Sequence, residues 1–212
     1  MVEIKPLSAK MSTVSNDRLF TIFRELQARG LIDKKRRLLE CPVTPNVQGM
    51  ARSIRYRKAF YEQKLAHLSD DALRFVLLHE EGHIKEGSLA TYGIAALPLL
   101  LLIGLAGSPL TAVPDAALSA LTVLLVSGAA LLCYRIFYRR MYEEEFVADR
   151  YAAETLQQHY NIGHPSRLLQ SILTGIADTG GSISPPCGRQ FSGYFPPIDE
   201  RVSRIRTGVD TA

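Results

Sequence analysis

The 212-residue sequence has few features of disulfide-rich or nucleotide-binding proteins. Its three cysteines, Cys41, Cys133 and Cys187, are scattered and odd in number, which argues against a disulfide framework and against a CxxC-type zinc site. The glycine-rich stretch 180–193 lacks the strand, loop and lysine of a phosphate-binding motif. Residues 1–30 contain no apolar core of a signal peptide. The small excess of 25 basic over 21 acidic residues does not indicate a nucleic-acid partner.

Charge is almost absent from residues 88–134, where Asp115 is the one formally charged side chain. Two apolar segments, at about 89–107 and 116–134, flank a short proline-containing connector. As a helix, each segment would be about 28 Å long, close to the thickness of the hydrocarbon core of a bilayer. The pattern predicts a helical hairpin that crosses a membrane twice. The alternative is a hairpin buried in a soluble core, but a chain of this length has little material to cover two all-apolar helices.

The charges that flank the hairpin predict its orientation. The connector contains no Lys or Arg, whereas Lys85 precedes the first apolar segment and Arg135, Arg139 and Arg140 follow the second. The positive-inside rule therefore places the connector outside and both flanks in the cytoplasm. We expect an integral membrane protein with two spans whose termini are cytoplasmic.

Outside the hairpin, the periodicity predicts mostly helices and a small sheet. Ser69 can cap a helix whose first turn contains Asp70 and Asp71, and Pro42 limits the preceding strand to an edge or a short length. The expected helices are about 15–29, 69–86, 138–159, 166–177 and 196–206, and the expected extended stretches are 38–44 and part of 46–60.

The helix that begins at Ser69 contains the H-E-x-x-H pattern, as HEEGH at residues 79–83. His79 and His83 are four residues apart and share a helix face, so both imidazoles can bind one Zn²⁺. Glu80 lies beside the first histidine, where it can contact a zinc-bound water and act as general base. The pattern points to zinc-dependent hydrolytic chemistry.

A catalytic zinc site requires a third protein ligand. Glu145 and Asp149 are favoured because the hairpin returns the chain to the side of the membrane that it left. They are four residues apart on one helix face, so one can bind the metal while the other holds the N–H of a histidine ligand. The full set of candidates is Glu86, Glu143, Glu144, Glu145, Asp149, His159 and His164.

These patterns together resemble the M48 family of membrane zinc metallopeptidases, which are gluzincins. The resemblance covers about residues 45–206. It rests on HEEGH at 79–83, the two-span hairpin, EFVAD at 145–149, and FPPIDER at 195–201, where the family commonly has HPPxxER.

The resemblance implies one Zn²⁺ per chain, bound by His79, His83 and Glu145, with Glu80 as general base and Asp149 supporting the ligands. It further implies a zinc metalloendopeptidase in a bacterial inner membrane. Its substrates would be membrane or membrane-associated proteins, cleaved at the cytosolic face.

One position departs from the family pattern. Phe195 replaces the family's histidine and cannot donate a hydrogen bond to an oxyanion. Tyr194, Arg201 and His164 are the residues that could contact an oxyanion or substrate instead. Loss of one oxyanion donor lowers the rate by about 10²–10³-fold, which predicts a slow enzyme. Two alternatives stay open: a regulatory antirepressor protease resembling the M56 family, and a catalytically impaired zinc-binding membrane adaptor.

The expected fold is mostly α with a small β-sheet, an α+β zincin-like domain. A transmembrane hairpin interrupts it between the HExxH helix and the helix of the third ligand. Residues 1–87 and 139–212 form the two cytosolic parts of the metallopeptidase domain, and residues 88–138 form the hairpin. The strand near 49–57 is expected to pair with an extended substrate.

Overall fold

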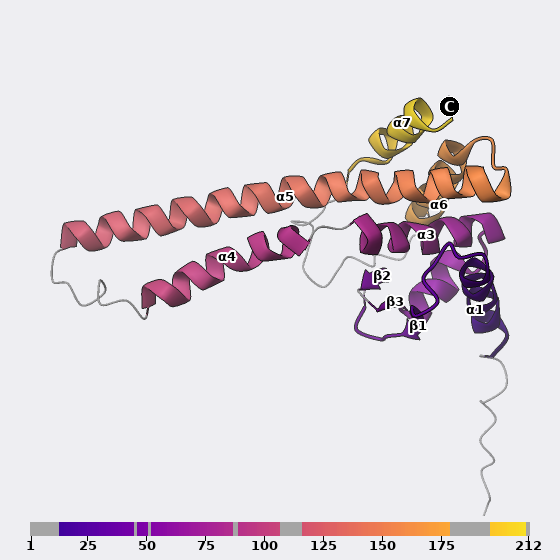
Figure 1. The fold of residues 1–212 in the computed structure, drawn as a ribbon, viewed down its shortest axis with the longest axis horizontal. Coiled ribbons are helices and arrows are strands. Elements are labelled where there is room, and N and C mark those ends of the chain that lie inside the picture. Colours follow the sequence, from indigo (N-terminus) through magenta and orange to yellow (C-terminus); the bar gives the residue numbers. More distant parts are fainter. Residues whose placement is uncertain are drawn as a thin grey trace, which may run out of the picture.

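The chain folds mainly into helices around one small sheet (Figure 1). The computed structural model describes residues 13–44, 46–50, 52–86, 89–106, 116–178 and 196–210. The helices in this part are α1 (Thr13–Ala28), α2 (Lys58–Phe60), the π-helical turn η1 (Tyr61–Leu65), α3 (Asp70–Glu86), α4 (Leu89–Ala106), α5 (Ala116–Tyr160), α6 (Pro165–Asp178) and α7 (Ile198–Gly208). The expected mostly helical chain with a small sheet is thus confirmed.

The sheet has three short strands in the order β1-β3-β2. β1 (Arg37–Glu40) pairs in parallel with β3 (Ser53–Tyr56), and β2 (Val47–Met50) pairs antiparallel with β3. Both outer strands are therefore edges. The prediction of one strand over 38–44 was too long, because pairing ends at Glu40, before Pro42. Part of the stretch 46–60 was expected to be extended, and it holds two paired strands, β2 and β3, followed by the start of a helical turn.

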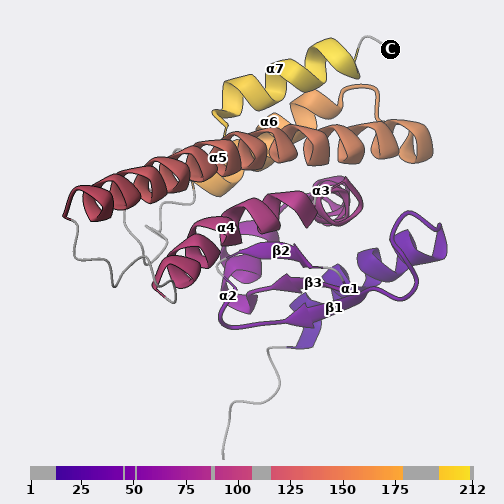
Figure 2. The ribbon, with the colours of Figure 1, turned by 60° about the vertical axis from the view of Figure 1, so that its left-hand side comes forward.

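Helix α3 lies between the sheet and the second half of α5, as Figures 1 and 2 both show. Its side chains Leu73 and Leu77 are fully buried, and so are Ala148 and Ala152 on α5. Small residues at this contact allow the two helix backbones to approach closely. A Cβ atom on Gly82 would lie 3.0 Å from the Cα atom of Ala148. The close packing of α3 on α5 brings the two segments with the predicted metal ligands together.

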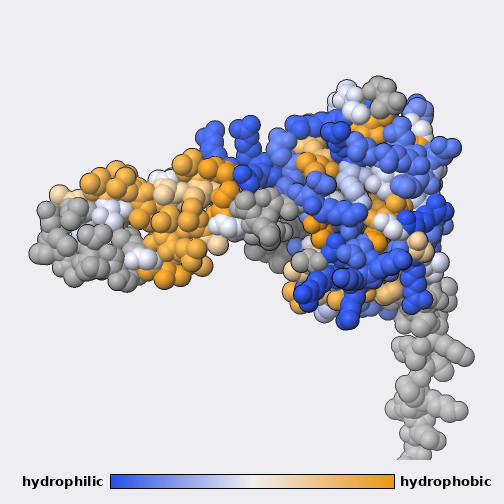
Figure 3. Space-filling model, viewed as in Figure 1, coloured by the Kyte–Doolittle hydropathy of each residue, from blue (hydrophilic) through white to orange (hydrophobic). Residues whose placement is uncertain are grey.

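Helix α4 and the first part of α5 pack against each other and project from the rest of the molecule (Figure 1). Apolar residues dominate the surface of this projection, whereas polar residues cover most of the visible face of the remainder (Figure 3). Among the described residues, one helix is long and apolar enough to cross a membrane. It is Ser119–Tyr160 of α5, and only 6% of its most apolar stretch is buried inside the molecule. The connector at 108–115 lies outside the described residues.

Gly82 offers a direct test of the α3–α5 contact. In Gly82→Val, the new side chain would meet the backbone of Ala148 and the ring of Tyr151 within 3.0–3.2 Å. Overpacking of this kind costs about 1–3 kcal/mol, so we expect a lower thermal unfolding midpoint in detergent. Gly208→Val is the matched control, because a Cβ there meets nothing within 4 Å. Equal midpoints for the two variants would contradict the close contact.

Candidate active site

Helix α3 presents His79, Glu80 and His83 to one pocket. The helix is capped at its start, where the Ala72 N–H donates to the Ser69 hydroxyl at 3.2 Å. Two histidines four residues apart lie one above the other on such a helix. Their Nε2 atoms are 3.1 Å apart. The local helix geometry alone therefore aims both imidazoles at one point.

Glu145 on α5 completes a cluster of three potential metal ligands. Its carboxylate oxygens lie 3.7 Å from the Nε2 atom of His79 and 3.4 Å from that of His83. The ligand atoms of the three residues all lie within 4.8 Å of one another. Two imidazole nitrogens and one carboxylate oxygen form a donor set that suits zinc, and atoms this close can meet ligand distances of about 2.0–2.2 Å together. The three residues fit one zinc ion.

Asp149 and Arg201 contact the residues of this cluster on the side away from the ligand atoms. An Asp149 oxygen lies 2.9 Å from the Nδ1 atom of His79, the ring nitrogen that does not face the ligand cluster. Arg201, on α7, donates two hydrogen bonds of 2.6 Å to Asp149, and its third nitrogen lies 3.3 Å from Glu145. The guanidinium of Arg201 therefore lies against both carboxylates. Arg201 also lines the cavity, and its expected contact with substrate or an oxyanion stays a prediction.

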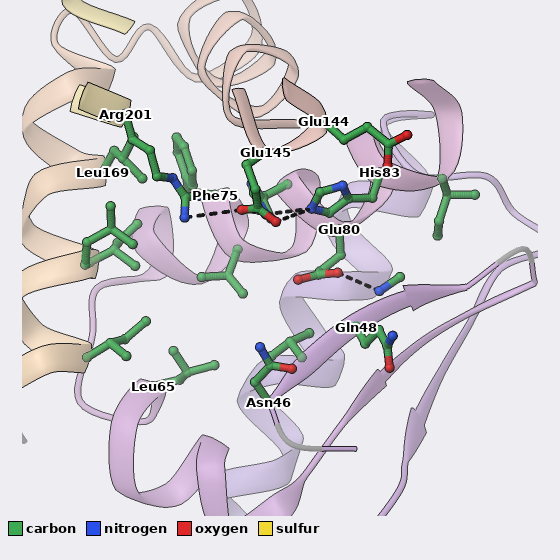
Figure 4. A pocket seen from close by; sticks show the side chains of 18 of the residues that line it. Asn46, Gln48, Leu65, Phe75, Glu80, His83, Glu144, Glu145, Leu169 and Arg201 are labelled. Carbon is green, nitrogen blue, oxygen red and sulfur yellow. Dashed lines mark hydrogen bonds and ion pairs between the residues drawn. The ribbon is translucent and has the colours of Figure 1, made fainter. Parts of the chain in front are cut away.

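Glu80 lies in the same pocket, against the sheet (Figure 4). The backbone N–H of Gly49 on β2 donates to a Glu80 carboxylate oxygen at 2.5 Å. Glycine is required at position 49, because a Cβ there would lie 2.4 Å from the backbone oxygen of Glu80. The edge strand thus lies directly against the helix that carries the candidate base.

Burial and charge act in opposite directions on the carboxyl groups of the site. Burial raises the pKa of Glu80, against the attraction of the two histidines. Burial also acts to raise the pKa of Glu145, but its bond to His83 and the nearby positive charges outweigh this effect and lower it. The pKa of Asp149 is lowered in the same way by its bonds to the imidazole and the guanidinium. Glu145 and Asp149 are held ionised, while Glu80 has the higher affinity for a proton.

A cavity of about 800 Å³ adjoins these groups. It lies between α3, β2, the start of the second half of α5, and α6. Figure 4 shows Glu80, His83 and Glu145 facing its interior, with the polar side chains of Asn46 and Gln48 along the β2 wall. A peptide segment could reach the cluster through a space of this size.

The other residues proposed from the sequence are placed differently. Tyr194 and Phe195 lie outside the described residues. Glu86, His159 and His164 are exposed and do not line the cavity, and Glu143 forms an ion pair with Arg204 at 3.2 Å. Glu144 lines the cavity but does not belong to the ligand cluster.

Sequence reasoning missed a buried ion pair next to the motif. Glu81, the first variable residue of HEEGH, is fully buried, and Arg36 donates two hydrogen bonds of 2.9 Å to it. This pair ties the turn before β1 to α3. Nothing in the basic run Lys34–Arg37 distinguishes Arg36 from its neighbours, so no sequence signal could have found the pair.

The fold and the cluster define a metal-dependent hydrolase site: two histidines and a glutamate within reach of one ion, and a buried carboxylate beside them. The model of peptidase family M48 matches residues 48–208, and the chain belongs to this family of zinc metallopeptidases. Comparison with curated proteins and with solved structures gave no match.

Asp149 should affect metal affinity without binding the metal itself. Asp149→Asn keeps the shape of the side chain but removes the charge that faces His79 and Arg201. Loss of such a partner typically weakens metal binding about 10–100-fold, so we expect a rise of that size in the zinc Kd, measured by competition with a chelating dye. Asp199→Asn, on the exposed first turn of α7, is the matched control. An unchanged Kd in Asp149→Asn would show that Asp149 does not support the ligand.

Proposed function

We propose that this M48 family member is a membrane-bound zinc metalloendopeptidase that acts on membrane or membrane-associated proteins at the cytosolic face. One observation carries the proposal: Glu80 projects into the same cavity as the three-ligand cluster and lies against the edge strand β2. The candidate general base, the three candidate metal ligands and the edge strand that could bind a peptide therefore all border one cavity.

His79, His83 and Glu145 would hold one Zn²⁺ per chain. When bound there, the ion supplies a Lewis acid that polarises a peptide carbonyl and makes water more acidic. Glu80 accepts a proton from the attacking water and then donates it to the nitrogen of the leaving amine. Arg201 and Asp149 keep the ligands in place throughout.

The edge of β2 would bind substrate as an added strand. In its antiparallel register with β3, Gln48 lies opposite Arg55 and Gly49 opposite Ile54. The Arg57 N–H donates to Asn46 at 3.1 Å, which makes alternate residues face β3. The backbone polar groups of Val47 and Gly49 therefore point away from the sheet, towards the cavity side. The Gly49 N–H already donates to Glu80, so an extended peptide would pair with the backbone groups of Val47 and with the carbonyl of Gly49.

A membrane location for the site is supported by the projecting helices. Exposed leucines such as Leu99 and Leu124 cover the projection, and the basic residues Arg135, Arg139 and Arg140 follow its end. We infer two spans, α4 and the first part of α5, with the site on the cytoplasmic side. Membership of family M48 favours this function over the M56-type antirepressor protease.

The function is tested by cleavage of casein with purified, zinc-loaded protein in detergent. Wild type should cleave casein in a chelator-sensitive manner. Glu80→Gln should lower the rate by about 10²–10⁴-fold, because a positioned general base contributes that much, and should still contain about one zinc per chain by elemental measurement.

Glu86→Gln is the matched control, because it makes the same change at an exposed position of the same helix. It should cleave like wild type. If wild type contains zinc and does not cleave, the peptidase assignment fails and the adaptor reading gains support. Restored cleavage in Phe195→His would then identify the missing oxyanion donor. If none of the proteins contains metal, the ligand set is wrong.

The two-span arrangement makes a separate prediction about the connector. With the three native cysteines replaced by serine, Thr111→Cys should react with a membrane-impermeant maleimide added to intact spheroplasts. Ser203→Cys, on α7, should react only after lysis. The reverse pattern, or labelling of neither variant before lysis, would contradict the proposed topology.

A further inference from the structure

The three-stranded sheet has one face that no described element covers. Side chains alternate between the two faces of a strand, and residues opposite each other in the register share a face. The face with Ile54 and Tyr56 is buried, and the Tyr56 ring lies 6.3 Å from that of Phe20 on α1. We name the opposite face the outer face. It consists of Arg37, Leu39, Gln48, Met50, Ser53 and Arg55, and of these only Ser53 is buried.

The outer face presents large apolar side chains to the surroundings. Leu39 is 42% exposed and Met50 is 41% exposed, although most of the exposed large apolar residues in the described structure belong to the projecting helices. Exposed apolar residues that lie together with polar ones around them mark an interaction surface for a protein or a membrane. The outer face therefore has the composition of a contact surface.

The same face is positively charged. Arg37 and Arg55 belong to it, and Arg52 lies in the turn between β2 and β3. None of the three forms an ion pair with a described residue. Glu40 is the one acidic residue in these strands, and the alternation places its side chain on the opposite face. A partner with negative charge would complement this surface.

The outer face points towards the side of the molecule from which α4 and α5 project. In Figure 1 the sheet lies between α1 and that side, and in Figure 2, in which that side comes forward, the strands are seen broadside. Because the buried face of the sheet contacts α1, the outer face is directed away from α1. With α4 and the first part of α5 as membrane spans, the outer face would face the bilayer.

The sheet would lie within range of the charge of the bilayer surface. It lies at the level of the site, because Gly49 on β2 bonds to Glu80. Arg140 is the last basic residue after the proposed second span, and Glu145 is five positions further on, roughly 8 Å along α5. The potential of an anionic leaflet acts over about one Debye length, about 8 Å at physiological ionic strength.

We propose that the outer face binds anionic lipid headgroups of the bilayer that α4 and α5 span. This inference rests on the proposed membrane arrangement and adds a second contact with the bilayer. The guanidinium groups of the three arginines pair with lipid phosphates, and the apolar side chains lie between them. A second copy of the chain is disfavoured as the partner, because pairing of two outer faces would bring like charges together.

The contact has a consequence for the site. Gln48 and Met50 belong to the outer face and also line the cavity. Binding of headgroups to the outer face therefore holds the rim of the cavity at the bilayer surface, where bonds of membrane-associated proteins are found.

The test measures the proximity of the outer face to headgroups in nanodiscs that hold one full-length chain each. The three native cysteines are replaced by serine, and Leu39→Cys carries a bimane fluorophore. The discs contain phosphatidylcholine alone or with about one third phosphatidylglycerol, and all contain the same share of a lipid with a nitroxide quencher on its headgroup. Each basic residue near an anionic surface shifts such a contact about fivefold, so three shift it about 10²-fold. Quenching should be strong with phosphatidylglycerol, weak without it, and reduced at high salt.

Charge variants identify the groups responsible. One variant replaces the arginines of this surface by glutamine: Arg37→Gln, Arg52→Gln and Arg55→Gln. It should abolish the effect of phosphatidylglycerol, whereas lysine at the same three positions should keep it, because the charge remains. The matched control makes the same change at exposed arginines of α1, α6 and α7: Arg24→Gln, Arg167→Gln and Arg206→Gln. This control should behave like the parent protein.

Several results would overturn the lipid contact. Equal quenching in the two kinds of disc would do so, and so would an equal loss in the glutamine variant and its matched control. Loss in the lysine variant as well would show a structural role of these arginines instead of a charge effect. A bimane on His159→Cys, at the exposed end of α5, should stay unquenched in both kinds of disc, and quenching there would show that the signal does not report the outer face.

A probe on α4 keeps failure of the membrane arrangement distinguishable. A bimane on Leu99→Cys should be quenched in both kinds of disc by a lipid with the nitroxide on its acyl chain. Absence of that quenching would overturn the two-span arrangement and the lipid contact with it. Quenching of Leu99→Cys without an effect of phosphatidylglycerol on Leu39→Cys would overturn the lipid contact alone.

Discussion

The site depends on two buried carboxylates that share one guanidinium. Glu145 and Asp149 come from α5 and face the histidines of α3, and Arg201 of α7 bonds to both. Buried carboxylates are stable only when they are paired, so this network fixes three elements that are distant in the sequence. Arg201 is the one guanidinium that bonds to these two carboxylates in the described structure, which leaves one negative charge of the pair in excess. A cation bound by His79, His83 and Glu145 would offset that charge.

Helix α3 packs against the sheet on one face and against α5 on the other. Gly49 brings β2 against the backbone of Glu80, and Gly82 brings α5 against the opposite face of α3. The buried pair of Arg36 and Glu81 holds the same helix to the turn before β1. A single helix that is clamped on two faces has little freedom to rotate, so its histidines remain aimed at Glu145.

Much of this arrangement could be predicted from the sequence because its signals are local. The spacing of His79 and His83 depends only on helix geometry, and the helix that carries Glu145 follows from the apolar run before it. The contact of Asp149 with a histidine ligand was predicted, but its bonds to Arg201 and the Arg36 partner of Glu81 could not be, because they arise from tertiary packing. The hairpin formed by β2 and β3 was missed for a similar reason: its strands are too short to show a clear alternation.

Helix α5 has a further consequence, because it continues unbroken from its apolar part to the ligand Glu145. In the proposed membrane arrangement it acts as a molecular ruler. From Tyr134 to Glu145 the chain advances eleven positions and rises by roughly 17 Å along the helix, which sets the height of the site above the bilayer surface. An extended chain covers about 3.3 Å per residue. A membrane-anchored protein would therefore need a spacer of about five residues before its bonds come within reach, so distance from the membrane would decide which bonds are cut.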